Sequence, residues 1–361
     1  MIARGASVLV AVAIAVSCGG TGRNSLPNVA NSTANATTAA NASPTATPLI
    51  DVYGMMGAFP PATFFVVGQD GVKAIALLNH VVKYTIPVAG GDVQVATANE
   101  VGRVYVLDQP ADGARLRWFD VAAGSERATR SVAGATVVKT GAGHGGLAVD
   151  RTTGSVFALL RQNDLIHVEE FDSLTLRPVR RLLGDFVCGE RIVAAAGRVV
   201  VACLNDGGLV VSERSGRGGK FLVKGGVVAL AMLPDGTLMA GAADGRLVRL
   251  SPDATELEEV NTLREYGARL IRDGIAVNAG CCFVYGIVDR VPKVDVRVIA
   301  GGPTLVAFPE ATPPSGGLFV QAPFAYYVIG GQARHIDINQ GFVEVMADVG
   351  AGAVPGAVAD R

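Results

Sequence analysis

The stretch Gly146–Leu159, which reads GLAVDRTTGSVFAL, contains a short apolar run, a polar turn that ends in glycine, and a second apolar run. Short apolar runs bounded by turn residues are typical of buried β-strands. Similar units recur along the chain, and the turn falls at Ala62, Gly102, Gly154, Gly197, Gly236, Gly280 and Pro323. Strand-rich repeats at intervals of roughly 40–50 residues are the signature of propeller blades. We therefore predict an all-β, seven-bladed β-propeller of four-stranded antiparallel blades.

The fifth repeat shows the strands most clearly. Two apolar runs, Val228–Met232 and Thr237–Ala242, flank a Pro-Asp-Gly turn, and Asp244-Gly245 then leads into Arg246–Leu250. Asp-Gly between apolar runs is a strong hairpin signal because the turn requires positive φ. After this repeat, leucines and a valine in Thr255–Arg272 fall near helical spacing, so a helical turn there is an alternative.

The last residues of the chain resemble the start of an inner strand. Gly352–Asp360 has the same pattern as His144–Asp150, and it follows the outer strand of the last repeat, Phe342–Val349. An open ring of blades leaves two unpaired sheet edges. We expect residues 354–359 to pair with Thr63–Val67 and to close the ring.

The N-terminus has the features of an export signal. Met1–Arg4 carries one positive charge, and the uncharged run Gly5–Val16 is shorter than the ~20 residues that span a bilayer. Residues 1–17 are therefore predicted to be a signal peptide. Residues 15–19, AVSCG, resemble the bacterial lipobox, and this resemblance implies cleavage before Cys18 and lipidation of its thiol. Ala15 stands where Leu is more usual, and ordinary secretory cleavage near the same point is the alternative.

A polar segment separates this signal from the repeats. Residues 18–48 consist mainly of Asn, Ser, Thr, Ala and Gly. Such a segment buries too little apolar surface to offset its ordering entropy, so we predict a flexible linker. The propeller then occupies 49–361. Together these features predict an extracytoplasmic protein of the bacterial cell envelope, lipid-anchored to a membrane.

Composition excludes some partners. The chain of 361 residues has 31 basic and 32 acidic residues, a formal net charge of −1, and no basic block stands out, which argues against nucleic acid. Half of the residues are hydrophobic and 46 are glycine, which suits many short strands joined by tight turns. No later apolar run approaches ~20 residues, so no spanning helix is expected.

The repeat pattern resembles the bacterial seven-bladed propellers that are related to the YVTN, NHL and WD40-like repeats. The resemblance covers nearly everything after the linker, although neither a YVTN tetrad nor a regular Trp-Asp ending is present. It implies a fold and not an activity.

Four cysteines follow Cys18. Cys188 and Cys203 are symmetric about a hairpin turn centred on residues 195–196, and an exported protein permits disulfides, so we predict a bridge between them. Cys281 and Cys282 are adjacent. Vicinal bridges of this kind occur beside the cofactor in some quinoprotein propellers, and the alternative is a pair of small buried residues.

Candidate ligand residues are expected on the face that carries the loops between blades. Acidic residues recur there between second and third strands, where they serve either a cation or basic partner or simply the tight turn. His144 lies in a Gly-rich loop on the same face, and Arg264, Tyr266 and Arg269 form a contact-type cluster. The full set of ligand-face candidates is His144, Asn163, Asp164, Asn205, Asp206, Arg264, Tyr266, Arg269 and Asp289.

No catalytic constellation emerges from these residues, because a single His without a paired acid or nucleophile is weak evidence of catalysis. We expect a membrane-anchored binding or scaffold module for an envelope protein, a peptide or a cell-wall ligand, acting as a monomer or in a hetero-complex. No cofactor or metal is predicted. The alternative is a propeller enzyme or cofactor binder, either a lactonase-like or metal-assisted hydrolase or a quinoprotein-like oxidoreductase. A purely structural part of an envelope assembly is a third reading.

Overall fold

The computed structural model describes part of the chain in detail. The described residues are 62–98, 101–186, 189–204, 206–262, 270–277, 283–288, 293–298, 306–310, 312–321, 324–337 and 342–359. The chain divides into two units, Met1–Gly57 and Ala58–Arg361, and every described residue belongs to the second. The predicted signal peptide, the lipidation site Cys18 and the linker 18–48 therefore lie outside the described residues. No helix in the described part is long and apolar enough to cross a lipid bilayer.

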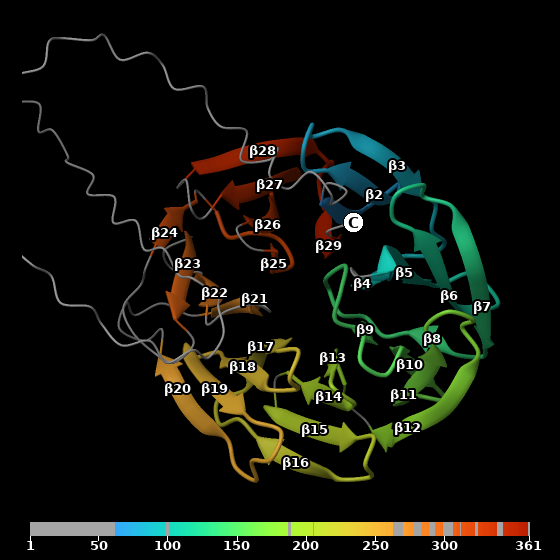
Figure 1. The fold of residues 1–361 in the computed structure, drawn as a ribbon, viewed down its shortest axis with the longest axis vertical. Coiled ribbons are helices and arrows are strands. Elements are labelled where there is room, and N and C mark those ends of the chain that lie inside the picture. Colours follow the sequence, from blue (N-terminus) through green and yellow to red (C-terminus); the bar gives the residue numbers. More distant parts are fainter. Residues whose placement is uncertain are drawn as a thin grey trace, which may run out of the picture. The chain divides into compact units, whose positions relative to one another are not determined.

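The described residues form seven antiparallel sheets placed around a common axis (Figure 1). The first three sheets are β29 (Val354–Ala359), β1 (Thr63–Gly68), β2 (Gly71–Ala76) and β3 (Val82–Ile86); β4 (Gln94–Ala98), β5 (Arg103–Asp108), β6 (Gly113–Asp120) and β7 (Glu126–Ala133); and β9 (Leu147–Asp150), β10 (Ser155–Gln162), β11 (Leu165–Asp172) and β12 (Pro178–Phe186), with a short extra strand β8 (Thr136–Val137) on β10. The next two are β13 (Arg191–Ala195), β14 (Arg198–Cys203), β15 (Gly208–Glu213) and β16 (Gly218–Leu222); and β17 (Val227–Met232), β18 (Leu238–Ala242), β19 (Arg246–Leu250) and β20 (Glu258–Thr262). The last two are β21 (Leu270–Val277), β22 (Phe283–Val288), β23 (Lys293–Val298) and β24 (Val306–Pro309); and β25 (Leu318–Gln321), β26 (Phe324–Ile329), β27 (Gln332–Asp337) and β28 (Phe342–Asp348).

Each sheet corresponds to one of the repeats identified in the sequence, and the inner strands contact one another in the order β29, β4, β9, β13, β17, β21, β25 and back to β29. The prediction of an all-β propeller built from four-stranded antiparallel blades is confirmed.

Apolar clusters lie between neighbouring sheets: one joins Tyr105 and Leu107 to Val156 and Leu160, and another joins Phe65 to Val104. A blade thus buries its faces by packing radially against its neighbours.

The ring closes as the C-terminal pattern predicts. Strand β29 pairs antiparallel with β1, with Thr63 opposite Ala359 and Phe65 opposite Ala357, and a bulge follows before Val66. The C-terminal strand therefore completes the sheet that the first strands of the propeller begin (Figure 1). Because β29 occupies the inner position, neither Phe64 nor Phe65 is exposed.

Two local predictions are corrected. Glu258–Thr262, inside the segment considered for a helical turn, is strand β20 paired with β19, because the outer edge of β19 needs a partner for its backbone groups. Residues 263–269 lie outside the described residues. The β13–β14 hairpin turns at Ala196 and Gly197, both at positive φ, one residue later than predicted. The ladder ends at the pair Arg191–Ala202, so the position opposite Cys203 in the same register is 190 and not 188.

Candidate functional site

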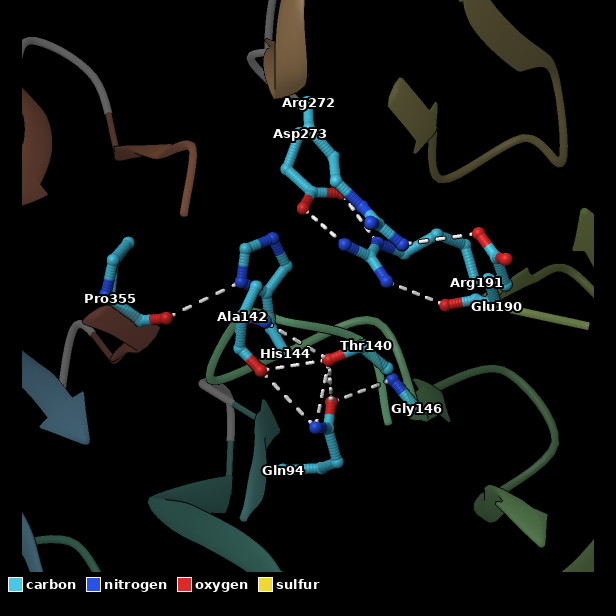
Figure 2. Close-up of polar contacts among 10 residues, drawn as sticks. All are labelled: Gln94, Thr140, Ala142, His144, Gly146, Glu190, Arg191, Arg272, Asp273 and Pro355. Atoms are coloured by element: carbon cyan, nitrogen blue, oxygen red, sulfur yellow. Dashed lines mark hydrogen bonds and ion pairs between the residues drawn. The ribbon is translucent and has the colours of Figure 1, made fainter. Parts of the chain in front are cut away.

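The inner strands enclose a central channel of about 520 Å³, a volume typical of small-molecule sites. Its wall is mostly aliphatic, and six of the seven inner strands place an alanine on it: Ala96, Ala148, Ala194, Ala231, Ala276 and Ala357. Small side chains fit where strands converge, as the inner-strand composition predicts. Six residues with polar side chains also line the channel: Thr97, His144, Arg151, Arg191, Asp273 and Gln321. Of these, His144, Arg191 and Asp273 lie together (Figure 2).

An ion pair joins the first residue of one inner strand to the N-terminal half of another. Arg191 is the first residue of β13, and its Nε donates to Oδ1 of Asp273 at 2.5 Å, while Nη2 donates to Oδ2. The third nitrogen, Nη1, donates to the Glu190 carbonyl oxygen at 2.6 Å. Both side chains are 3% exposed, so each charge depends on the other in a poorly solvated place.

This pair connects blades that are not neighbours. Strand β13 belongs to the fourth sheet and β21 to the sixth, and the fifth sheet stands between them. Asp273 reaches the pair because β21 is irregular between Leu270 and Ile275, where its register on β22 shifts. Its φ is +58°, a conformation that Asp tolerates better than most residues. Beside it, Arg272 donates to Glu190 at 3.1 Å in a more exposed ion pair (Figure 2).

The Gly-rich loop before β9 crosses this end of the channel. The Gly143 carbonyl accepts from Val95 N–H at 2.8 Å, and the Gly145 carbonyl accepts from Ile192 N–H at 2.7 Å, so the loop bonds to the inner strands on both sides of its own. A Cβ on Gly145 would lie 2.3 Å from Cδ of Arg191, and this φ is +90°. Glycine is therefore required here for close packing over the channel.

Gln94 fixes both ends of this loop. The side chain is 1% exposed, and its Nε2 donates to Thr140 Oγ1 at 2.9 Å while its Oε1 accepts from Gly146 N–H at 2.9 Å. Thr140 Oγ1 in turn donates to the Ala142 carbonyl at 2.8 Å. Figure 2 shows this network directly below the His144 ring. Because buried polar groups are costly to leave unpaired, the network fixes the loop conformation.

His144 is held at the channel by this loop. Its Nδ1 lies 3.3 Å from the Pro355 carbonyl, which only accepts, so Nδ1 carries the hydrogen of the neutral ring. The ring meets Phe319 of β25 edge-on, with centroids 4.8 Å apart. Burial lowers the pKa of His144, and the Arg191 guanidinium lowers it further, while Asp273 and the Pro355 carbonyl oppose the shift. The imidazole is therefore neutral at pH 7 and offers Nε2 as an acceptor.

The structure brings one of the predicted ligand-face residues to the channel, namely His144. Asn163 and Asp164 are exposed in the β10–β11 turn with φ of 51° and 63°, and Asp206 is exposed before Gly207, whose φ is 72°. These positions serve tight turns, which supports the turn reading of the recurring acidic residues. Asn205, Arg264, Tyr266, Arg269 and Asp289 lie outside the described residues, as do Cys188, Cys281 and Cys282.

Sequence reasoning missed Arg191 and Asp273. A signal exists, because Glu190-Arg191 and Arg272-Asp273 are charge pairs of opposite order, and each lies near the start of an alanine-containing inner strand. Charges at the start of a buried strand require partners. Nothing in the sequence indicates that these two segments partner each other across an intervening blade.

Comparison with known proteins agrees with the fold. No family model matches the sequence, and no curated protein matches it. The WD40 repeats of RRP9 are 12% identical, with a TM-score of 0.58, covering 82% of this chain and 94% of that one. Virginiamycin B lyase from Staphylococcus aureus is 11% identical, with a TM-score of 0.51, covering 71% and 83%. A quinoprotein alcohol dehydrogenase-like protein from Bacteroides thetaiotaomicron is 11% identical, with a TM-score of 0.54, covering 82% and 78%. Identities this low show the fold alone, and the chain is a β-propeller whose structural neighbours range from WD40 repeats to lyase and quinoprotein-like proteins.

Proposed function

We propose that the protein is a lipid-anchored, extracytoplasmic binding or scaffold module of the bacterial cell envelope, and that its central channel receives the ligand. The N-terminal sequence pattern supports the anchor and the location. The observation that carries the binding proposal is a channel of about 520 Å³ with a largely aliphatic wall and a small set of fixed polar groups at one end. An apolar cavity with a few convergent polar groups is the usual form of a ligand site.

The polar groups favour binding over catalysis. Arg191 and Asp273 satisfy each other, so neither offers a free charge to a reaction. His144 is neutral, and no carboxylate among the described residues hydrogen-bonds its ring. A general base normally needs an orienting acid or a nucleophile within hydrogen-bond reach.

The same groups define the class of ligand. A charged group entering the channel would have to compete with the Arg191–Asp273 pair, at a large desolvation cost. An apolar group ending in an uncharged donor, such as a hydroxyl or amide, instead meets Nε2 of His144 and the aliphatic wall. A side chain or an acyl-type group of an envelope peptide or wall component fits this description.

The channel is tested by filling it. Ala276, on β21, lines the channel and belongs to none of the apolar clusters that join the blades among the described residues. After incubation with an envelope extract, native mass spectrometry of the full-length protein should detect a bound component in the wild type and in Val179→Phe, whose side chain is on the exposed outer strand β12. Ala276→Phe should lose it. Equal binding by all three proteins, or none by the wild type, would count against the channel as the site.

The anchor is tested separately. Cys18→Ser should move the protein from the membrane fraction to the soluble extracytoplasmic fraction and abolish incorporation of labelled fatty acid. Continued membrane association with no fatty-acid label in the wild type would reject the lipid anchor while leaving the channel proposal intact.

An enzymatic role is the second candidate, and one observation favours it: the neutral His144 presents an acceptor nitrogen at the channel. A hydrolase or oxidoreductase of this kind would need a metal or redox cofactor near that nitrogen. Elemental analysis and an absorption spectrum of the purified full-length protein distinguish the two. A stoichiometric cofactor that His144→Gln removes would replace the binding proposal.

A further inference from the structure

Two histidines and a glutamate meet at the outer side of the ring, across the seventh sheet from the strand that lines the channel. His335 on β27 stands opposite Glu344 on β28 in the sheet register, and His80 comes from the turn after β2 of the first sheet. Among the described residues this group of three has its candidate ligand atoms within 4.8 Å of one another. The cluster plays no part in the function proposed above.

The distances agree with metal coordination. His80 Nδ1 lies 3.5 Å from one carboxylate oxygen of Glu344, and His335 Nε2 lies 3.5 Å from the other. In a tetrahedral zinc site, bonds of about 2.0–2.2 Å place ligand atoms about 3.3–3.6 Å apart. Each imidazole nitrogen therefore already lies at the required distance from one oxygen of Glu344, and the three candidate ligand atoms lie within 4.8 Å of one another. A small closing movement of these side chains would bring them around one ion.

The surroundings hold the ligands in position. The His335 ring is 4% exposed and meets Phe324 edge-on, with centroids 5.5 Å apart at 87°. His80 has a φ of 57°, and its N–H donates to the Ala76 carbonyl at 3.0 Å, which fixes the turn that presents the ring. Glu344 is half-exposed, so an ion can enter from solvent.

We propose that His80, His335 and Glu344 bind a divalent transition-metal ion of the Zn²⁺ class, with water completing the coordination. Imidazole nitrogens favour Zn²⁺ over Ca²⁺ or Mg²⁺, and two imidazoles with one carboxylate form a known zinc ligand set. The ligands come from the seventh sheet and the first sheet, and the first sheet is the one that β29 completes. A bound ion would therefore fasten two blades together beside the point of ring closure.

The test uses full-length protein without a polyhistidine tag, stripped with a chelator and titrated with Zn²⁺ alone by calorimetry. The wild type should bind one equivalent, and its Tm should rise with Zn²⁺. His80→Gln and Glu344→Gln change partly exposed side chains, so both should fold normally by circular dichroism. Each should weaken Zn²⁺ binding at least about tenfold and lose the rise in Tm, since loss of even an indirect contact to a ligand costs 10–100-fold.

Glu169→Gln is the matched control. Glu169 lies 3.9 Å from His167 in a histidine–carboxylate pair, and neither residue belongs to the three-ligand group found in the described part of the chain. This variant should bind Zn²⁺ as the wild type does. Co²⁺ in place of Zn²⁺ should give tetrahedral d–d bands without thiolate charge-transfer absorption. Wild-type binding below one equivalent, unchanged binding by His80→Gln and Glu344→Gln, or a thiolate spectrum would overturn the proposal.

Discussion

The ion pair between Arg191 and Asp273 allows a quantitative prediction. Asp273→Asn keeps the size of the side chain and tolerates the positive φ, so it removes only the charge that Arg191 needs. Arg191→Met removes the guanidinium and its three hydrogen bonds and leaves the Asp273 carboxylate buried. Because an unpaired buried charge costs about 3–5 kcal/mol, each single variant should lower the free energy of unfolding by that amount.

The neighbouring pair supplies a control. Arg272 and Glu190 come from the same two segments, but their side chains are 50% and 33% exposed. Arg272→Met should therefore cost less than about 1 kcal/mol. In the double variant Arg191→Met/Asp273→Asn no net charge remains buried, so its cost should fall below the sum of the two single costs by at least about 2 kcal/mol.

The assay is equilibrium unfolding in urea, followed by the fluorescence of the single tryptophan, Trp118 on β6, and by circular dichroism. Trp118 is two sheets from Arg191, so coincidence of the two signals would show that the whole ring unfolds together. The reasoning is refuted if each single variant costs no more than Arg272→Met. Strict additivity in the double variant would equally show that the two charges do not depend on each other.

Three further outcomes are expected. Truncation after Gly352 removes β29, uncovers the inner edge of β1 and should abolish cooperative unfolding, which calorimetry would detect as the loss of a single sharp transition. Because the pKa of His144 is lowered from 6.5, the folded state binds fewer protons than the unfolded state, so the wild type should lose stability as pH falls below about 6.5. His144→Gln should lose less stability over the same range, and parallel pH profiles for the two proteins would disprove the assignment. Peptide mapping without reductant should find Cys188 linked to Cys203, and recovery of both as free thiols would reject that bridge.

The repeat could be predicted because its determinants are local. Each turn and each pair of strands lies within about ten residues, and the period of the repeat sets the blade. Closure by β29 could be predicted for the same reason, since Gly352–Asp360 carries the inner-strand pattern. The β13–β14 register was harder, because Gly197 is the one turn-favouring residue in Ala194–Gly197 and the second turn position is Ala196, which adopts a φ of 52°. The turn therefore lies one residue later than predicted, and the bridge between Cys188 and Cys203 stays a prediction because Cys188 lies outside the described residues.

The contacts of Arg191, Asp273 and His144 at the channel could not be predicted from the sequence. They join blades that are not neighbours in the ring, and a repeat pattern indicates only contacts between neighbouring blades. A ring of blades is held by contacts between neighbours, and these contacts account for the apolar clusters between sheets. The Arg191–Asp273 pair and the His144–Phe319 contact instead join sheets separated by at least one other. A buried ion pair is a poor source of net stability compared with apolar packing of the same volume. Because Arg191 and Asp273 satisfy each other, the pair offers no charge to a ligand. We infer that it instead fixes the end of the channel against which an uncharged ligand would lie.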